Sequence, residues 1–276
     1  MKDLSITDQF QGFLNTADIF NKEQSFEFKT FEFPNIKITS ELRSDLEKID
    51  HPRNSVMGKR MESFFEIAIK HSDRYELLAS NIQIIENKNT LGELDFLLFD
   101  HQTSKPLHVE LVYKLYVYDQ AFPSEIQRWI GPNRKDSFSE KLKKLREKQF
   151  PLLHRPETFK YLDSLDIDIE NTEQQLCFKS QLFIPENLEL NDQVINPRSH
   201  KGAWYSYEEF LKKPWQDHLF YSPEKKNWSC DPTKNHNWFS YHDLLDTVQI
   251  LFEKNKAPLI WMKTGTSFQR FFIVWW

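Results

Sequence analysis

Two acidic residues, Asp95 and Glu110, lie on two neighbouring segments whose apolar residues alternate. Residues 93–99 and 107–118 have the period-two pattern of half-buried β-strands, and the residues between them have loop composition. Folding this hairpin about the middle of its loop, between Gln102 and Thr103, places Asp95 opposite Glu110. Directly opposed residues have Cβ atoms roughly 5 Å apart. We therefore expect two carboxyl groups side by side on one face of the hairpin.

Two like charges at that separation repel each other, and something must offset the repulsion. A divalent cation does so readily, because hard carboxylate oxygens are preferred ligands of Mg²⁺. The alternative is that one of the two carboxyl groups keeps its proton. We predict Asp95 and Glu110 to be ligands of Mg²⁺ or Mn²⁺, and a structural charge network on a solvated sheet face is the other interpretation.

Three more residues are candidates for the same site. Lys114 follows Glu110 by four positions on the same strand face, where an ammonium group can orient a water and stabilise charge on a phosphate. Glu62 lies on a predicted helix over residues 56–72 and can reach the cation through water, unless it is an exposed helical carboxylate. His108, predicted opposite Leu97, is expected to be a partner of a nearby carboxylate more than a third ligand.

Glu62, then Leu94-Asp95, then Glu110 followed by Lys114, resembles the pattern of the PD-(D/E)XK nuclease superfamily. The stretches TLGELDFLLFD, HVELVYKLYVY and IGPNRKDSFSEKLKKLREKQF also resemble an uncharacterised bacterial family of unknown function that is assigned to this superfamily. The resemblance covers roughly residues 56–150. It implies a restriction-endonuclease-like fold, Mg²⁺ held by Asp95 and Glu110, and a catalytic lysine. Val112 occupies the position where the superfamily pattern has that lysine, and no proline precedes Asp95.

A basic segment follows the second predicted strand. Between residues 134 and 148 there are seven basic residues: Arg134, Lys135, Lys141, Lys143, Lys144, Arg146 and Lys148. In the superfamily the helix after the lysine strand often faces nucleic acid, so the resemblance implies phosphate contacts by Arg134 and Lys141. The alternative is a solvated helix face with internal ion pairs such as Glu140–Lys144.

The order of predicted elements indicates an α/β fold with a mixed central sheet flanked by helices. We expect a single domain, with an N-terminal helical extension (1–50), a nuclease-like core (51–150) and an aromatic-rich C-terminal elaboration (151–276). The aromatic residues of the last part could stack on unpaired bases, but they are better explained as a core. The terminal FFIVWW is expected to be a buried, paired strand. Cys230, His236 and His242 lack the spacing of a structural zinc site.

The composition restricts the function further. Six glycines and the lack of both glycine motifs argue against a Gly-rich phosphate-binding loop and against a dinucleotide-binding fold. A net charge of −5 argues against a strong general DNA binder. Two distant cysteines, no leader pattern and no long apolar run indicate a cytoplasmic protein without a membrane partner.

The leading function is a Mg²⁺-dependent phosphodiester hydrolase acting on DNA or RNA through water activated by the cation. The alternatives are a catalytically inactive nuclease-fold module that binds nucleic acid or a protein, and a hydrolase of small phosphate esters.

Overall fold

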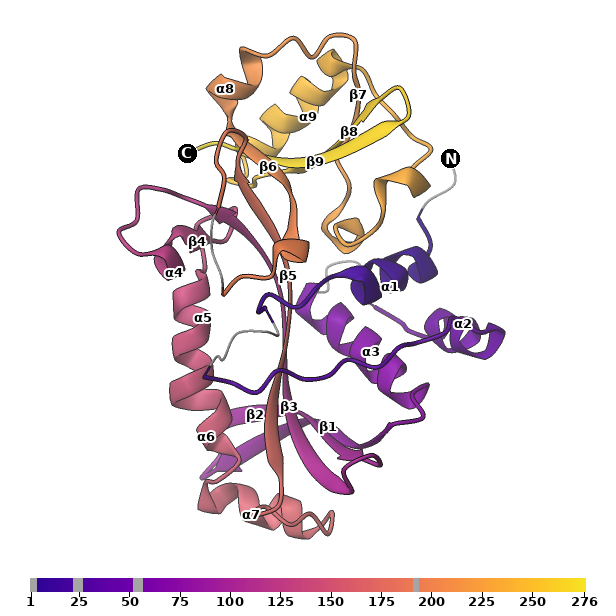
Figure 1. Ribbon diagram of the computed structural model, residues 1–276, viewed down its shortest axis with the longest axis vertical. Coiled ribbons are helices and arrows are strands. Elements are labelled where there is room, and N and C mark those ends of the chain that lie inside the picture. The colour runs from indigo at the N-terminus through magenta and orange to yellow at the C-terminus, as the bar shows by residue number, and fades with distance from the viewer. Residues whose placement is uncertain (1–3, 22–26, 52–56, 191–193) are drawn as a thin grey trace. The chain divides into compact units, whose positions relative to one another are not determined.

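The protein has an α/β fold, described here from a computed structural model that covers residues 4–21, 27–51, 57–190 and 194–276. Within these residues nine strands form one mixed sheet in the order β1-β2-β3-β5-β6-β9-β8-β7, with β4 paired to β3 (Figure 1). This confirms the predicted fold class. The strands are β1 (Tyr75–Glu86), β2 (Asn89–Asp100), β3 (Lys105–Tyr118), β4 (Trp129–Ile130), β5 (Glu173–Pro185), β6 (His200–Ser206), β7 (Leu219–Tyr221), β8 (Leu259–Thr264) and β9 (Ser267–Val274).

The α-helices of the described residues include two in the expected N-terminal helical extension and one after residue 240. The α-helices are α1 (Ile6–Asn15), α2 (Ser40–Glu47), α3 (Met57–Lys70), α4 (Glu125–Arg128), α5 (Phe138–Lys144), α6 (Phe150–Leu152), α7 (Pro156–Asp163), α8 (Tyr207–Leu211) and α9 (Tyr241–Phe252). Val56, the expected first residue of α3, lies outside the described residues. No helix in the described part of the chain is long and apolar enough to cross a membrane.

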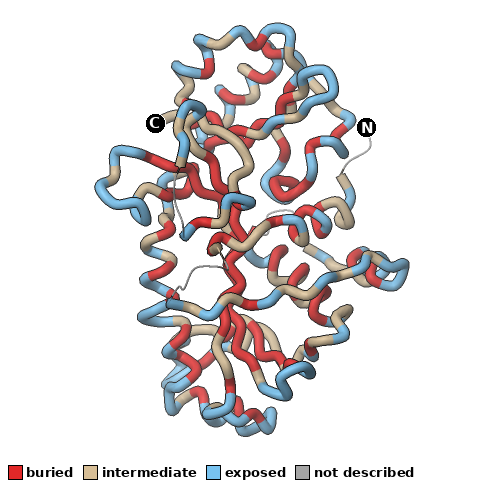
Figure 2. The backbone as a smooth tube through the Cα atoms, viewed as in Figure 1, coloured by how far each residue is buried: buried red, intermediate tan, exposed pale blue. Residues whose placement is uncertain are grey.

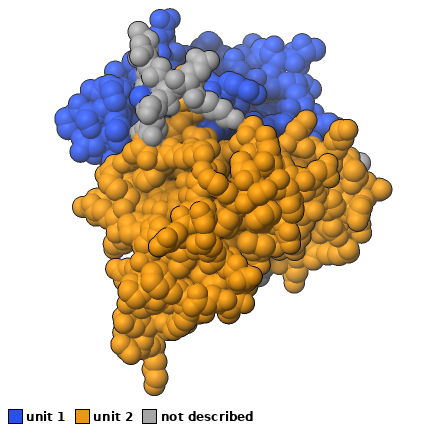
Figure 3. Space-filling view, turned by 60° about the horizontal axis from the view of Figure 1, so that its bottom comes forward, with its two compact units in different colours: residues 1–19, 114–139, 180–276 blue, residues 20–113, 140–179 orange. Residues whose placement is uncertain are grey.

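The chain divides into two compact units, which are coloured separately in Figure 3. Unit 1 contains residues 1–19, 114–139 and 180–276, and unit 2 contains residues 20–113 and 140–179. Strands β3 and β5 contribute residues to both units. The predicted division into extension, core and elaboration stays a prediction.

Unit 2 is built on a β1-β2-β3 meander with two tight turns. The first turn has positive φ at both central residues, 49° at Asn87 and 68° at Lys88, as a two-residue hairpin of the favoured hand requires. In the second hairpin, Asp100 pairs with Lys105, Leu97 with His108 and Phe96 with Val109. This register confirms that the hairpin folds about the point between Gln102 and Thr103.

Helices cover both faces of the unit 2 meander. Phe65 of α3 lies 4.4 Å from Phe96 of β2, measured between ring centroids. The next residue of β2, Leu97, packs in a buried cluster with Leu152 of α6 and Leu162 of α7. Because successive strand residues point to opposite faces, α3 covers one face and α6 and α7 cover the other (Figure 1).

Unit 1 has an aromatic core, which supports the structural interpretation of the C-terminal aromatic residues. Phe210, Trp215, Tyr241 and Phe271 belong to one buried cluster between β6, β8 and β9 and helices α8 and α9. Residues 271–274 of the terminal FFIVWW are buried in β9, which pairs with β6 and β8 (Figure 2). The expected buried, paired strand is therefore present.

The basic helix changes its geometry at its C-terminal end. α5 continues through a π-helical turn over Leu145–Gln149 into α6, which contains Pro151. A proline in an α-helix clashes with the carbonyl group four residues earlier. The wider π turn directly before Pro151 relieves that crowding. It also changes which face of the helix Gln149 occupies.

Candidate functional site

Asp95 and Glu110 lie in unit 2, at the point where the β2–β3 ladder stops. The recorded ladder runs from Asp100 back to Phe96, and Asp95 with Glu110 would be its next pair. Here the Asp95 side chain takes a backbone donor instead: its Oδ2 accepts the N–H of Leu111 at 2.9 Å. The two carboxyl groups are close enough for the charge of one to act strongly on the other.

Asp95 holds its proton at neutral pH. Burial and then the charge of Glu110 raise the pKa of Asp95 to about 8. The hydrogen bond from Leu111 and the charge of Lys141 oppose this shift, and Glu62 adds to it. The structure therefore supports the second way of offsetting the repulsion between the pair, in which one carboxyl group stays protonated when no cation is present.

Glu110 is the hydrogen-bonded member of the pair and is completely buried. Gln174 donates to Nδ1 of His108 at 2.9 Å, so Nδ1 is the acceptor nitrogen and Nε2 carries the proton. That Nε2–H lies 3.0 Å from Oε1 of Glu110 and donates to it. Gln149 donates to the other oxygen, Oε2. Two donors thus fix the Glu110 carboxyl group, and His108 is the carboxylate partner that we expected.

Lys141 and Gln149 reach this site from the helix that follows β3. Lys141 donates to Oε1 of Gln149 at 2.7 Å, and Gln149 donates to Glu110. The π turn ends at Gln149, and such turns occur frequently at functional sites. Lys141 therefore contributes its charge beside the carboxylate pair, in addition to being a candidate for phosphate contact.

Glu62 lies near the pair on the α3 side. Its side chain is 24% exposed and forms an ion pair with Lys59 at 2.9 Å. Lys59 also donates to Oδ1 of Asn81 at 2.9 Å. Asn81 lies within β1 with φ 53°, a conformation that is uncommon in a strand and is often found at functional sites. The charge of Glu62 acts on Asp95, and the role predicted for Glu62 in the site stays a prediction.

Lys114 and Arg134 lie in unit 1 and have other partners there. Lys114 forms an ion pair with Asp136. Arg134 donates to Oδ2 of Asp119 at 2.6 Å, and its guanidinium carbon lies 3.8 Å from the ring centroid of Trp276. The roles predicted for Lys114 in catalysis and for Arg134 in phosphate contact stay predictions.

The donor set fits a cation that keeps most of its water. Among the described residues no group of three or more His, Cys, Asp or Glu side chains is arranged to hold a metal ion. Mg²⁺ commonly binds through only one or two carboxylates and keeps several waters, so the role predicted for Asp95 and Glu110 as cation ligands stays a prediction. Cys177 and Cys230 are both free and buried.

Four residues near the carboxylate pair were not predicted there from the sequence. They are Lys59, Asn81 and Gln149, together with Lys141, which was predicted only as a phosphate contact. Asn81 had one usable signal, because asparagine tolerates positive φ and interrupts a run of apolar strand residues. Gln149 had none, because its position depends on the π turn.

The fold and the site together define an α/β protein with a buried, hydrogen-bonded carboxylate pair at the end of a β-hairpin ladder. The chain belongs to the family described as domain of unknown function DUF1853, whose model matches residues 37–274. No curated protein and no solved structure matches the chain. The family model assigns no activity to the chain and does not link it to the nuclease superfamily.

Proposed function

We propose that this protein is a divalent-cation-dependent phosphodiester hydrolase that acts on DNA or RNA. The observation that carries the proposal is the placement of Asp95 beside the buried Glu110 on neighbouring strands, where burial and the charge of Glu110 raise the pKa of Asp95. A pair that shares a proton in the absence of metal is suited to exchange that proton for a cation. The resemblance of Glu62, Asp95 and Glu110 to the PD-(D/E)XK pattern supports a nuclease over other metal-dependent enzymes.

Each residue of the site has a role in this proposal. Asp95 and Glu110 hold Mg²⁺ or Mn²⁺, and the cation polarises a phosphate oxygen and makes water a stronger nucleophile. Lys141 stabilises the negative charge that develops on the phosphate, because its charge already acts on Asp95. His108 and Gln149 fix the orientation of Glu110. Glu62 presents a partly exposed carboxylate that can accept a proton from the attacking water.

The lysine role falls to Lys141 more naturally than to Lys114. Lys141 acts electrostatically on Asp95, whereas Lys114 is paired with Asp136. Lys141→Gln is therefore expected to lower cleavage by about 100-fold, the size of effect seen when one donor to a developing oxyanion is removed.

A catalytically inactive module that binds nucleic acid or a protein is the alternative, and one observation favours it. Both oxygens of Glu110 already accept hydrogen bonds, and the residue is completely buried. Activity requires Gln149 to release Oε2 when a cation arrives. A module without catalysis requires no such change.

Cleavage of labelled single- and double-stranded DNA and RNA tests the proposal. We expect cleavage in Mg²⁺ or Mn²⁺, none in a chelator, and a loss of more than about 100-fold in Glu110→Gln. Glu147→Gln, an exposed residue of the same π turn, is the matched control and should cleave normally. Equal cleavage by wild type and Glu110→Gln would refute the assignment to this site. Binding of nucleic acid by the wild type without cleavage would favour the inactive module.

A further inference from the structure

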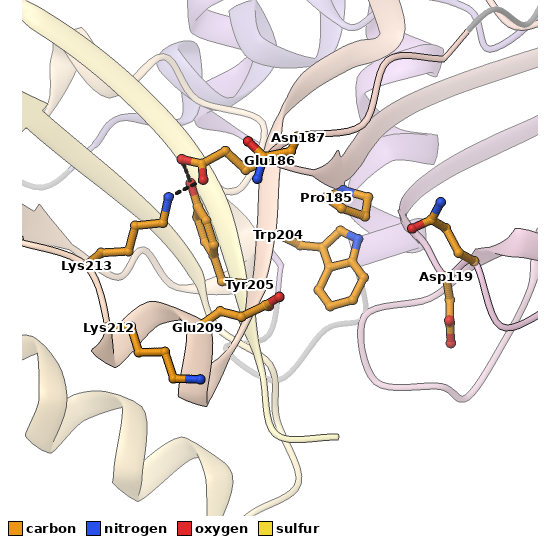
Figure 4. Close-up of a pocket in the computed structure, with 10 residues that line it drawn as sticks. Asp119, Pro185, Glu186, Asn187, Trp204, Tyr205, Glu209, Lys212 and Lys213 are labelled. Atoms are coloured by element: carbon orange, nitrogen blue, oxygen red, sulfur yellow. Dashed lines mark hydrogen bonds and ion pairs between the residues drawn. The ribbon is translucent and has the colours of Figure 1, made fainter.

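A pocket of about 480 Å³ lies in unit 1, formed by the ends of β5 and β6, helix α8 and the loop after β3 (Figure 4). Its volume is within the range of small-molecule sites. Trp204 and Tyr205 of β6, Glu186 and Asn187 after β5, and Lys212 and Lys213 after α8 are among its lining residues. None of these residues belongs to the carboxylate site of unit 2.

The acidic side chains of the pocket already have partners. Glu186 forms an ion pair with Lys213 and accepts a hydrogen bond from Tyr205 Oη at 2.9 Å (Figure 4). Asp119 pairs with Arg134. Glu209 accepts from the backbone N–H and the hydroxyl of Ser206, both at 2.8 Å, and so caps α8.

Lys212 is the cationic side chain of this pocket that has no ion pair. It is exposed at the end of α8, and within the described residues its ammonium group has no hydrogen bond or ion pair. Glu209 has no cationic partner among the described residues either, so the pocket as a whole is not cationic, but the ammonium group of Lys212 can bind the anionic group of a ligand. A phosphate group suits a lysine, which acts as a compact point charge with three donors.

Trp204 supplies a flat apolar surface next to that charge. Its Nε1 donates to the carbonyl of Tyr118 at 2.9 Å, which fixes the edge of the indole, and the residue lines the pocket (Figure 4). On another side Trp276 lies 5.3 Å from it, between ring centroids. A planar ring can stack on such an indole without regard to its exact substituents. The Asn187 amide can donate to or accept from the polar edge of that ring.

We propose that this pocket binds a nucleotide, with the base on Trp204 and the phosphate on Lys212. Two sources present this chemistry: a free mononucleotide and one unit of a single-stranded nucleic acid. The site needs no cation and no hydrolysis, so it stands apart from the function proposed for Asp95 and Glu110.

Binding to the full-length protein in a chelator tests this inference, by calorimetry with AMP, CMP, adenosine, inorganic phosphate and a single-stranded pentanucleotide. We expect AMP and CMP to bind at one site. Adenosine and phosphate should bind at least about tenfold more weakly, because adenosine lacks the phosphate group and inorganic phosphate lacks the base. Tighter binding of the pentanucleotide identifies a nucleic acid as the source. Equal or tighter binding of the mononucleotides identifies a free nucleotide.

Matched variants place the binding in this pocket. Trp204→Leu and Lys212→Gln should each weaken AMP binding by about fivefold or more, because stacking and the phosphate contact are lost. Trp238→Leu and Lys254→Gln alter unit 1 residues that do not line the pocket and should bind AMP normally.

Lys212 is exposed, so Lys212→Gln keeps the test decisive if Trp204→Leu does not fold. Glu110→Gln should also bind normally, which separates this inference from the nuclease proposal. No binding of any probe, or equal binding by wild type, Trp204→Leu and Lys212→Gln, would overturn it.

Discussion

Asp95 and Glu110 are neighbours with different surroundings. Glu110 is completely buried and has two hydrogen-bond donors, His108 and Gln149. Asp95 has one backbone donor and the negative charge of Glu110 beside it. This asymmetry decides which of the two carboxyl groups keeps a proton when no cation is bound.

Asp95→Asn should change the pH dependence of stability in one direction. The folded-state pKa of Asp95 is about 8, above its ordinary value of 3.8, so its stabilising contribution is complete below 3.8 and is lost as pH rises through 8. Asparagine resembles the protonated acid at every pH. The free energy of unfolding of the variant, relative to that of the wild type, should therefore rise by about 2 kcal/mol between pH 5 and pH 9, after allowance for solvent screening.

Urea unfolding from pH 5 to pH 9 in a chelator measures this difference. Asp163→Asn changes an exposed aspartate of the same unit and should leave the profile unchanged. Parallel wild-type and Asp95→Asn profiles across that range would show that Asp95 does not carry the proton.

Gln149→Leu should destabilise the protein because it leaves one buried oxygen of Glu110 without a donor. An unsatisfied buried acceptor costs about 1–3 kcal/mol. Saturating Mn²⁺ should recover part of this loss, since the cation takes over the freed oxygen. Lys148→Leu, at an exposed neighbouring position, should change the free energy of unfolding by less than about 0.5 kcal/mol in either condition. A Gln149→Leu variant as stable as the wild type would mean that this hydrogen bond is dispensable.

At the scale of elements, the β2–β3 hairpin is predictable from local sequence, and the helix after it is predictable only in part. Alternating apolar residues and a loop centred between Gln102 and Thr103 specify the register, which places Asp95 beside Glu110. The π turn depends on packing and on Pro151, and no periodicity in the sequence reveals it. The placement of Lys141 and Gln149 follows from that turn.

The full length of β1 also could not be predicted from the local sequence. The apolar residues Ile82, Ile84 and Ile85 mark its end, but β1 begins at Tyr75. Its register shifts between Leu77 and Ala79 and again between Ile84 and Ile85, so side chains do not keep a strict alternation. A sequence pattern that assumes period two misses such a strand.

Two helical glycines should respond oppositely to alanine. A Cβ at Gly12 in α1 would lie 2.1 Å from the backbone oxygen of Ser229, and neither backbone can yield easily. A Cβ at Gly58 in α3 would meet nothing within 4 Å. Gly12→Ala should lose about 1–3 kcal/mol of unfolding free energy, and Gly58→Ala should gain up to about 1 kcal/mol from helix propensity.

Thermal or urea unfolding of both variants checks the pair, and each variant serves as the other's control. A neutral Gly12→Ala would mean that α1 does not pack closely on the segment around Ser229.

At the scale of the whole molecule, the α/β class follows from the alternation of helical and strand patterns, and the sheet confirms it. The aromatic residues after position 200 form a core because aromatic side chains bury large areas when they pack against one another. The order in which β5, β6 and β9 pair was not predictable, since it depends on contacts between residues far apart in the chain.

Mn²⁺ binding to wild type, Asp95→Asn and Glu110→Gln, measured by calorimetry at pH 6 and pH 8.5, tests the central claim most directly. The carboxylate pair predicts one ion per wild-type chain, at least about tenfold tighter binding at pH 8.5, and release of a proton on binding at pH 6. Both variants should lose this site, and Glu147→Gln should keep it. Equal Mn²⁺ affinity in wild type and both variants, or no bound ion in the wild type at either pH, would contradict a cation site at Asp95 and Glu110.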